Sequence, residues 1–278
     1  MIKFKGGIMY RLIVSDLDGT LLRDDNTLSE YTKSIIHKVS QQGIEFMLAT
    51  GRIFGGAKGY AKELNLDTPI LSCNGALIKG TDGTVIYGKH IEPSPLTEVF
   101  HLLQGKELYF HFYGEENFYT RKLTDYMSRF YDLNKKLEEQ ERFPIIEVDP
   151  FEVAGKDSIY KVLAHCGTEE HERNELYELL KAVPGISVTS SWSNTFDICA
   201  DQVNKGIAIE RYAAEKGINP SEILCFGDNF NDLEMIQYAG MGVAVENAVT
   251  LVKETANYVT LSNNEDGVAK AIEKLILS

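Results

Sequence analysis

Short apolar runs alternate with segments of helical periodicity near both ends of the chain. The runs are rich in Val, Ile, Leu and Phe, as is typical of strands buried on both faces of a parallel sheet. They cover residues 12–14, 44–48, 70–73, 223–226 and 241–245. Helical spacing of apolar residues follows over 32–39, 57–64, 207–212, 233–238, 249–253 and 267–275. Strands that alternate with helices predict an α/β fold, a Rossmann-like three-layer core with a mostly parallel sheet and right-handed crossovers.

The pattern changes in the middle of the chain. Asp82-Gly83 separates two short apolar runs, which predicts an antiparallel hairpin over 77–87. Helices are then expected over 96–103 and 170–183 and from Thr124, with strands over 108–113, 118–120, 160–166 and 186–189. The α/β pattern resumes with a strand over 196–200. We therefore predict an α/β core of residues 1–88 and 191–278, interrupted by an inserted α+β domain at residues 89–190.

Carboxylates follow two of the predicted core strands. Asp16 and Asp18 come after the first strand, and Asp228 and Asp232 after the strand over 223–226. Ligands of open parallel sheets bind beyond the carboxyl ends of the strands. Gly19 permits the turn that Asp16 and Asp18 need to face one point. If the two strands are neighbours, the clustered negative charges require a cation. An all-oxygen ligand set selects Mg²⁺ over zinc.

Two further segments of the chain are suited to bind a phosphoryl group. Thr50-Gly51 ends a strand shortly before a helix, where free N–H groups and the helix dipole favour an anion, and Lys205 lies near the start of another helix. A carboxylate beside these groups and a cation could attack phosphorus, while a second acid protonates the leaving oxygen. Each residue alone also fits an ordinary strand exit, turn or cap. Their common placement at strand ends and helix starts favours the catalytic interpretation.

These segments resemble the four ordered motifs of the haloacid dehalogenase superfamily of phosphatases. The motifs are Asp16-Leu17-Asp18-Gly19-Thr20, Thr50-Gly51-Arg52, Lys205-Gly206 and Gly227-Asp228-x-x-Asn231-Asp232. Asn74-Gly75-Ala76, followed by a large α+β insertion, is similar to the Cof-type (IIB) subgroup. The resemblance covers nearly the whole chain and implies that the insertion is a cap that closes over the site and selects the substrate.

The resemblance also implies a role for each site residue. Asp16 would be the nucleophile and a Mg²⁺ ligand, and Asp18 the general acid/base that binds the metal through its backbone carbonyl. Asp228 would be the third protein ligand, and Asp232 would support the metal site without contacting the metal directly. The phosphoryl group would be held by residues from four segments, namely Thr50, Gly51, Arg52, Asn74, Lys205 and Asn231. The polar segment Asp201–Asn204 before the lysine has no role assigned from sequence.

Composition limits the classes of partner. A formal charge of −13 disfavours nucleic acid and anionic membranes, but a small anionic substrate can bind where a metal or a lysine reverses the local field. The four cysteines are unpaired in sequence and three lie in apolar runs, which indicates reduced core thiols. His101, His111, His165 and His171 lack metal-ligand spacing and are interpreted as surface or packing residues, of which His111 could reach a substrate.

We predict a cytoplasmic, Mg²⁺-dependent phosphatase of small phosphorylated metabolites, with sugar phosphates favoured and no obligate protein partner evident. No signal peptide or membrane span is expected. A phosphomutase would use the same aspartyl phosphate but return an isomer. A phospho-acceptor switch or binding module would stay phosphorylated, although the large insertion disfavours it. Periodicity does not decide which of Tyr113, Phe118, Tyr126 and Trp192 face the substrate.

Overall fold

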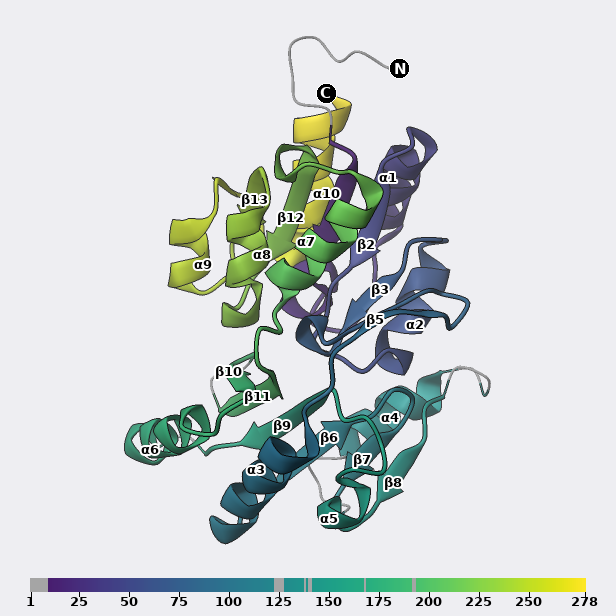
Figure 1. Ribbon diagram of the computed structural model, residues 1–278. Helices are drawn as coiled ribbons and strands as arrows, with labels where there is room; N and C mark the ends of the chain where they lie inside the picture. Colours follow the sequence, from purple (N-terminus) through teal and green to yellow (C-terminus); the bar gives the residue numbers. More distant parts are fainter. Residues whose placement is uncertain (1–9, 123–127, 138, 140–141, 168, 192–193) are drawn as a thin grey trace.

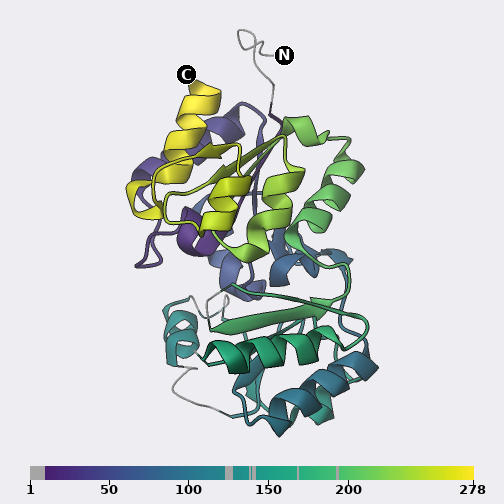
Figure 2. The same cartoon turned by 90° about the vertical axis from the view of Figure 1, so that its left-hand side faces the viewer.

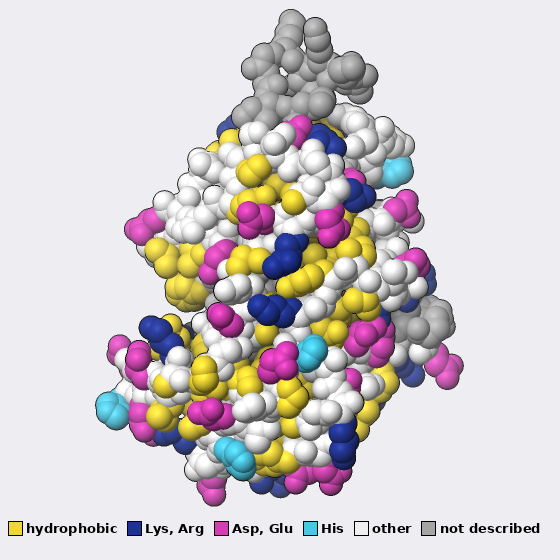
Figure 3. Space-filling model, viewed as in Figure 1, with side chains coloured by type: hydrophobic (Ala, Val, Ile, Leu, Met, Phe, Trp, Pro, Cys, Tyr) yellow, Lys and Arg dark blue, Asp and Glu magenta, His cyan; other side chains and the backbone are white. Residues whose placement is uncertain are grey.

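The computed structural model describes residues 10–122, 128–137, 139, 142–167, 169–191 and 194–278. Figure 1 shows two parts, a core above and an inserted domain below, with the C-terminus at the end of the core far from the insertion. On the face shown in Figure 3, acidic and basic side chains are interspersed among hydrophobic ones. Over the described ranges, every helix is too short or too polar to cross a membrane.

The core sheet has five strands, and all of its pairings are parallel. Its order is β14-β13-β12-β1-β2. The strands are β1 (Leu12–Ser15), β2 (Glu45–Leu48), β12 (Ile223–Gly227), β13 (Met241–Ala244) and β14 (Tyr258–Val259). The chain passes from β1 to β2 on one side, whereas β12 pairs with β1 on the other. The carboxyl ends of β1 and β12 therefore form a topological switch point, where ligands of open α/β sheets bind.

Helices cover both faces of this sheet, which confirms the predicted three-layer core. They are α1 (Glu30–Gln41), α2 (Gly55–Glu63), α7 (Lys205–Lys216), α8 (Leu233–Tyr238), α9 (Thr250–Thr255) and α10 (Gly267–Ile272). α7 and α8 lie on one face and α1 and α10 on the other (Figures 1 and 2). α1 begins where Ser29 Oγ accepts a hydrogen bond from the Thr32 N–H, since this serine is a favoured N-cap residue.

A small antiparallel sheet extends the core beside β2. It contains β3 (Ile70–Ser72), β4 (Leu77–Lys79) and β5 (Val85–Gly88), which confirms the predicted hairpin. β3 was expected as a further parallel strand, but its link to the five-stranded sheet is a single parallel bridge between Ala49 and Leu71. Cys73 and Asn74 have positive φ angles of 50° and 57°, so the chain reverses there into β4.

The inserted domain contains a six-stranded sheet of order β10-β11-β9-β6-β7-β8, antiparallel except for the β7–β8 pair. Its strands are β6 (Phe110–Tyr113), β7 (Phe118–Thr120), β8 (Ile145–Glu147), β9 (Lys161–His165), β10 (Ile186–Thr189) and β11 (Thr195–Ala200). Its helices are α3 (Pro93–Gly105), α4 (Ser128–Lys136), α5 (Pro150–Val153) and α6 (Glu170–Lys181). The expected helix start at Thr124 lies outside the described residues.

One strand was wrongly assigned to the core. β11 pairs with β9 and β10 of the inserted domain, because its buried run continues that antiparallel sheet before the chain returns through α7. An apolar run of six residues does not reveal which sheet it joins. We therefore propose that the inserted domain extends to about residue 200 rather than 190. The short elements β8, α5 and β14 were not predicted.

The two faces of the inserted sheet differ in character. α3 and α6 lie on the side away from the core (Figures 1 and 2). Phe100 of α3 packs on Phe110 and Phe112, whose rings lie 5.6 Å and 5.0 Å from its own. Side chains alternate across a strand, so their neighbours His111 and Tyr113 face the core. A side of the sheet that includes polar residues therefore faces the core.

Candidate active site

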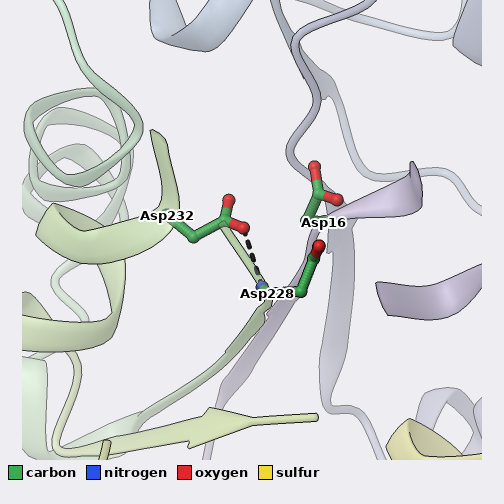
Figure 4. A group of neighbouring side chains, drawn as sticks. All are labelled: Asp16, Asp228 and Asp232. Atoms are coloured by element: carbon green, nitrogen blue, oxygen red, sulfur yellow. Dashed lines mark hydrogen bonds between the residues drawn. The ribbon is translucent and has the colours of Figure 1, made fainter. Parts of the chain in front are cut away.

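The carboxylates of Asp16, Asp228 and Asp232 converge at the carboxyl ends of β1 and β12. Ser15 pairs with Phe226 in parallel register, and the Asp16 N–H donates to the Phe226 carbonyl at 3.0 Å. One oxygen from each of the three carboxylates can be chosen so that all lie within 4.8 Å of one another. Figure 4 shows the Asp16 and Asp228 side chains close together and Asp232 beside them. β1 and β12 are thus adjacent strands, as predicted.

The turn after Asp16 depends on Gly19. Residues Leu17–Leu21 form a kinked turn, in which Asp18 and Gly19 have non-helical backbone angles and Gly19 has a φ of 80°. A Cβ atom on Gly19 would lie only 2.8 Å from Asp228 Oδ2. The next residue, Thr20, donates its hydroxyl to Asp228 Oδ1 at 2.6 Å. Glycine is therefore needed both for the left-handed backbone and for the close approach of Asp228.

Lys205 connects the two acidic segments. Its ammonium lies 2.6 Å from Asp16 Oδ1 and 2.6 Å from Asp232 Oδ1, and the side chain is fully buried. It occupies the first position of α7, where the Asn204 side chain accepts a hydrogen bond from the Ile207 N–H. This N-cap accounts for Asn204 in the polar segment that had no role from sequence.

Asp232 has donors at both carboxylate oxygens. Oδ1 faces Lys205, and Oδ2 accepts from the backbone N–H groups of Asp228 and Asn229 at 2.9 Å and 3.0 Å. Figure 4 draws the bond to Asp228 as a dashed line. These contacts orient the loop that carries Asp228.

Burial and mutual repulsion perturb the acids. Desolvation raises the pKa of Asp16 to about 7, with Lys205 opposing the shift and Asp232 and Asp18 adding to it. The pKa of Asp228 is raised well above its usual value, first by burial and then by Asp16 and Asp232. Burial alone would lower the pKa of Lys205, but Asp16 and Asp232 raise it overall. One ammonium does not neutralise this group of carboxylates, so the site is suited to a further cation.

Arg52 is directed at Asp18. Its Nε and one terminal nitrogen donate to the two Asp18 oxygens at 2.7 Å and 2.5 Å, a bidentate pair. Its backbone N–H donates to Thr50 Oγ1 at 3.1 Å, which closes the Thr50–Arg52 turn. The sequence-based role of Arg52 in phosphate binding stays a prediction, and in the structure its guanidinium pairs with Asp18.

Asn74 and Asn231 meet beside this turn. Asn231 Nδ2 donates to Asn74 Oδ1 at 3.0 Å, and Asn74 adopts the left-handed backbone with a φ of 57°. Within the described part of the chain, the buried Asn74 Nδ2 has no hydrogen-bond partner. A buried donor without an acceptor is costly, so its place beside Gly51 suits an anionic ligand.

A cavity of about 1010 Å³ lies between the core and the inserted domain. The core contributes Asp16, Asp18, Gly51, Arg52, Asp228 and Asn231, among others. The inserted domain contributes mainly side chains from the core-facing side of its sheet, including His111, Tyr113, Phe118, Lys161, Leu163 and His165. Of the candidate specificity residues, Tyr113 and Phe118 line this cavity, while Tyr126 and Trp192 lie outside the described residues.

The four cysteines and His111 support the sequence-based interpretations. All four cysteines are buried and free, as predicted for core thiols. His111 is buried against Phe118, with ring centroids 4.6 Å apart, and its Nε2 lies 3.0 Å from the Tyr113 hydroxyl. It therefore packs within the wall of the cavity.

Sequence reasoning missed the polar residues that the inserted domain brings to the core. Lys161 and Asp197 form a buried ion pair, and Ser191 contacts Asn231. The signal that could have found the pair is the charge itself, because Lys161 lies between Tyr160 and Val162 and Asp197 lies between Phe196 and Ile198.

The fold places the chain among α/β proteins in which a second sheet domain is inserted into a parallel core. Within that class, the family model of the haloacid dehalogenase-like hydrolases matches residues 13–272. The chain therefore belongs to this family, and the resemblance noted in the sequence is confirmed.

Similar proteins match along almost the whole chain. A putative phosphatase of Bacillus subtilis, YxeH, is 32% identical over 282 residues, covering 97% of this chain and 100% of its own. YitU from the same organism, a 5-amino-6-(5-phospho-D-ribitylamino)uracil phosphatase, is 30% identical and covers 95% of this chain and 96% of its own. A solved haloacid dehalogenase-like hydrolase from Bacteroides thetaiotaomicron superposes with a TM-score of 0.82 at 29% identity, covering 96% and 100% of the chains. The prediction of a phosphoric monoester hydrolase is thus confirmed at the level of the family.

Proposed function

We propose that this protein is a Mg²⁺-dependent phosphatase that hydrolyses small phosphorylated metabolites through an aspartyl phosphate on Asp16. The observation that carries the proposal is the cluster of Asp16, Asp228 and Asp232 around the buried Lys205, beneath a cavity shared with the inserted domain. Membership in the hydrolase family supports it independently.

The donor set fits a hard divalent cation. Carboxylate oxygens from three aspartates lie within 4.8 Å of one another, and the pKa values of Asp16 and Asp228 are raised. A cation bound between these oxygens would stabilise the ionised acids. Asp16, Asp228 and the Asp18 carbonyl would hold Mg²⁺, with Asp232 orienting the Asp228 loop through its backbone contacts. When bound, the metal would neutralise charge on the phosphoryl oxygens.

Asp16 is proposed as the nucleophile. Lys205 contacts one of its oxygens and limits the mobility of the carboxylate. The carboxylate attacks phosphorus, the bond from phosphorus to the ester oxygen breaks, and the leaving oxygen takes a proton from Asp18. Asp18 then accepts a proton from the water that attacks the acyl phosphate, which releases inorganic phosphate and restores Asp16. Arg52 donates to both Asp18 oxygens and so orients this side chain beside the reaction centre.

The phosphoryl oxygens would be bound by donors that surround this centre. We assign them to the Thr50 hydroxyl, the Gly51 N–H, Lys205, Asn231 and Asn74 Nδ2, which has no hydrogen-bond partner among the described residues. Such donors stabilise charge more strongly in a site from which water is excluded. The inserted domain would exclude that water while it covers the substrate.

The substrate is proposed to be a phosphate ester of a small polyol or sugar. The relative YitU is named for a substrate whose phosphate sits on a ribityl chain attached to a uracil ring. In this chain, a cavity with a polar floor and partly aromatic walls could accept either a sugar or a sugar-like chain that carries a ring.

The direct test is phosphate release from a panel of sugar, nucleotide and cofactor phosphates, with Mg²⁺ and with EDTA. We expect free phosphate from at least one sugar or sugar-alcohol ester, and its loss in EDTA. Formation of an isomeric phosphate ester without free phosphate would instead indicate a phosphomutase. A stable phosphoprotein with negligible turnover would indicate a phospho-acceptor switch.

A further inference from the structure

The inserted domain buries an ion pair next to the proposed phosphoryl site. Lys161 on β9 and Asp197 on β11 are only 2% and 0% exposed, and Lys161 Nζ lies 2.6 Å from Asp197 Oδ1. Burying two charges costs desolvation energy that their attraction often fails to recover, so such a pair is weak evidence for a role in stability. The contacts that each partner makes outside the pair are more informative.

Lys161 reaches from the inserted domain into the core. Its Nζ donates to the Gly51 carbonyl at 2.8 Å. The N–H of the same peptide group, that of Arg52, donates to Thr50 Oγ1 at 3.1 Å. The Gly51–Arg52 peptide is therefore held at both of its polar ends, one of them by a residue of the inserted domain.

Glycine at position 51 leaves room for the approach of Lys161. A Cβ atom there would lie 3.1 Å from Lys161 Nζ and 2.8 Å from Asn74 Oδ1. The glycine that is proposed to donate its N–H to phosphate thus also lets the lysine contact the turn.

Asp197 makes a second link to the core through Ser191. Its other oxygen accepts a hydrogen bond from the Ser191 hydroxyl. The same hydroxyl accepts from Asn231 Nδ2 at 3.2 Å, and the Ser191 carbonyl accepts from Asn229 Nδ2 at 2.8 Å. Lys161 is therefore hydrogen-bonded to the Thr50–Arg52 turn, and Asp197 is linked through Ser191 to the segment that carries Asn231. Both segments are proposed to bind the phosphoryl group.

We propose that Lys161 and Asp197 are positioning residues, which hold the Thr50–Arg52 turn in its phosphoryl-binding geometry while the inserted domain covers the site. This inference rests on the proposed phosphatase function. In this role the pair makes the donor geometry depend on the position of the inserted domain, because both charges lie on that domain. Arg52 extends the effect to Asp18, which its guanidinium holds.

The test uses the double variant Lys161→Met/Asp197→Asn, which removes both charges together and leaves neither one buried alone. The matched control is Lys79→Met. Lys79 is also only 2% exposed and also joins the core to the inserted domain, but its ammonium donates to Glu115 and Glu116 rather than to the Gly51 carbonyl. Both proteins are first compared with the wild type in thermal unfolding.

The first readout is steady-state hydrolysis of p-nitrophenyl phosphate with Mg²⁺. We expect kcat of the double variant to fall by at least about tenfold with a smaller change in KM, since misplacing a catalytic group lowers the rate of the chemical step. The Lys79→Met protein should keep kcat within about threefold of the wild type, a margin below the tenfold effect of misplacement. A double variant with the kcat of the wild type, or equal losses in both variants, would overturn the inference.

The second readout is amide hydrogen exchange over residues 49–52, measured without substrate. Exchange should be faster in the double variant and unchanged in Lys79→Met, and equal exchange in all three proteins would overturn the inference. The exchange result does not depend on turnover. A wild-type protein that hydrolyses no phosphate ester but shows the exchange difference would therefore overturn the proposed phosphatase function and retain the restraint on the turn.

Discussion

At the scale of single residues, the site is defined by unequal environments of similar side chains. Asp16 is buried against Lys205, whereas Asp18 is partly exposed and paired with Arg52. Asp232 has donors at both oxygens, and Asp228 accepts from Thr20. Four aspartates that look equivalent in the sequence therefore have different neighbours, and we infer different duties from them.

Replacing the proposed nucleophile should remove activity while leaving the fold intact. In Asp16→Asn the amide cannot attack phosphorus, so phosphate release should fall by at least about a thousandfold. Asparagine has nearly the same shape, and the variant should show cooperative unfolding like the wild type. Release of phosphate from a generic ester would be compared for the two proteins, and a variant that retains turnover would rule out Asp16 as nucleophile.

His111 should make stability depend on pH. Burial, followed by Lys161 and His165, lowers the pKa of this imidazole well below 6.5. Below the unfolded pKa the unfolded chain binds a proton that the folded protein excludes, so the contribution of His111 to stability is lost as pH falls below about 6.5. A single such group changes the unfolding free energy by at most about 1.4 kcal/mol per pH unit.

The variant His111→Phe should flatten this acid-side loss. Urea unfolding between pH 7.5 and pH 5 would be compared for the wild type, His111→Phe and Tyr113→Phe. The last variant keeps the buried imidazole and should keep the dependence. Parallel curves for the wild type and His111→Phe would contradict the assignment.

At the scale of elements, the site is assembled by strand ends, one tight turn and one helix start. Asp16 and Asp228 directly follow β1 and β12, and Lys205 is the first residue of α7. The turn at Gly19 lets the chain pass close to Asp228. Lys161 and Asp197 reach the same place from two strands of the inserted sheet. Rigid elements hold such constellations more precisely than long loops would.

Gly19→Ala should damage the site more than its backbone strain alone explains. A left-handed alanine costs about 1–2 kcal/mol, and the new Cβ would also press against Asp228 Oδ2. Gly43→Ala is the matched control, since Gly43 has the same φ of 80° and a Cβ atom added there would meet no atom within 4 Å. We expect both variants to lose stability in urea unfolding, and Gly19→Ala alone to lose phosphate release as well. Equal activity in the two would contradict the steric argument.

At the scale of the whole molecule, the chain carries a net charge of −13, and three of its acids meet at the switch point. The buried acids at the switch point repel one another, and the folded protein keeps them together at an energetic cost. A bound divalent cation would reduce that cost in the native state and not in the unfolded chain. Metal binding should therefore raise the free energy of unfolding.

Mg²⁺ should raise the melting temperature of the wild type. At about 100 times its Kd, a ligand specific for the native state stabilises it by about 2.7 kcal/mol. Asp228→Asn should lose most of this gain, while Glu175→Gln, which removes an exposed charge on α6 paired with Lys106, should keep it. Thermal unfolding with and without Mg²⁺ provides the measurement. An equal gain in Asp228→Asn would place the metal elsewhere.

Much of the core could be predicted because its signals are local. Buried strands such as β1 are continuous apolar runs, α1 carries its own N-cap at Ser29, and the hairpin has Asp82-Gly83 at its turn. The acids follow such strands directly. Their convergence needed one further assumption, that β1 and β12 are neighbours, which the sheet order bears out.

The sequence by itself therefore determined most of the strands and helices and the order of the acidic and proposed phosphoryl-binding motifs, since each depends on neighbouring residues along the chain. Only the tertiary structure decided that β11 joins the inserted sheet, that Arg52 holds Asp18, and that Lys161 and Asp197 face Gly51 and Ser191. Lys161 and Gly51 are 110 positions apart, so their contact depends on how two sheets pack and on no local pattern.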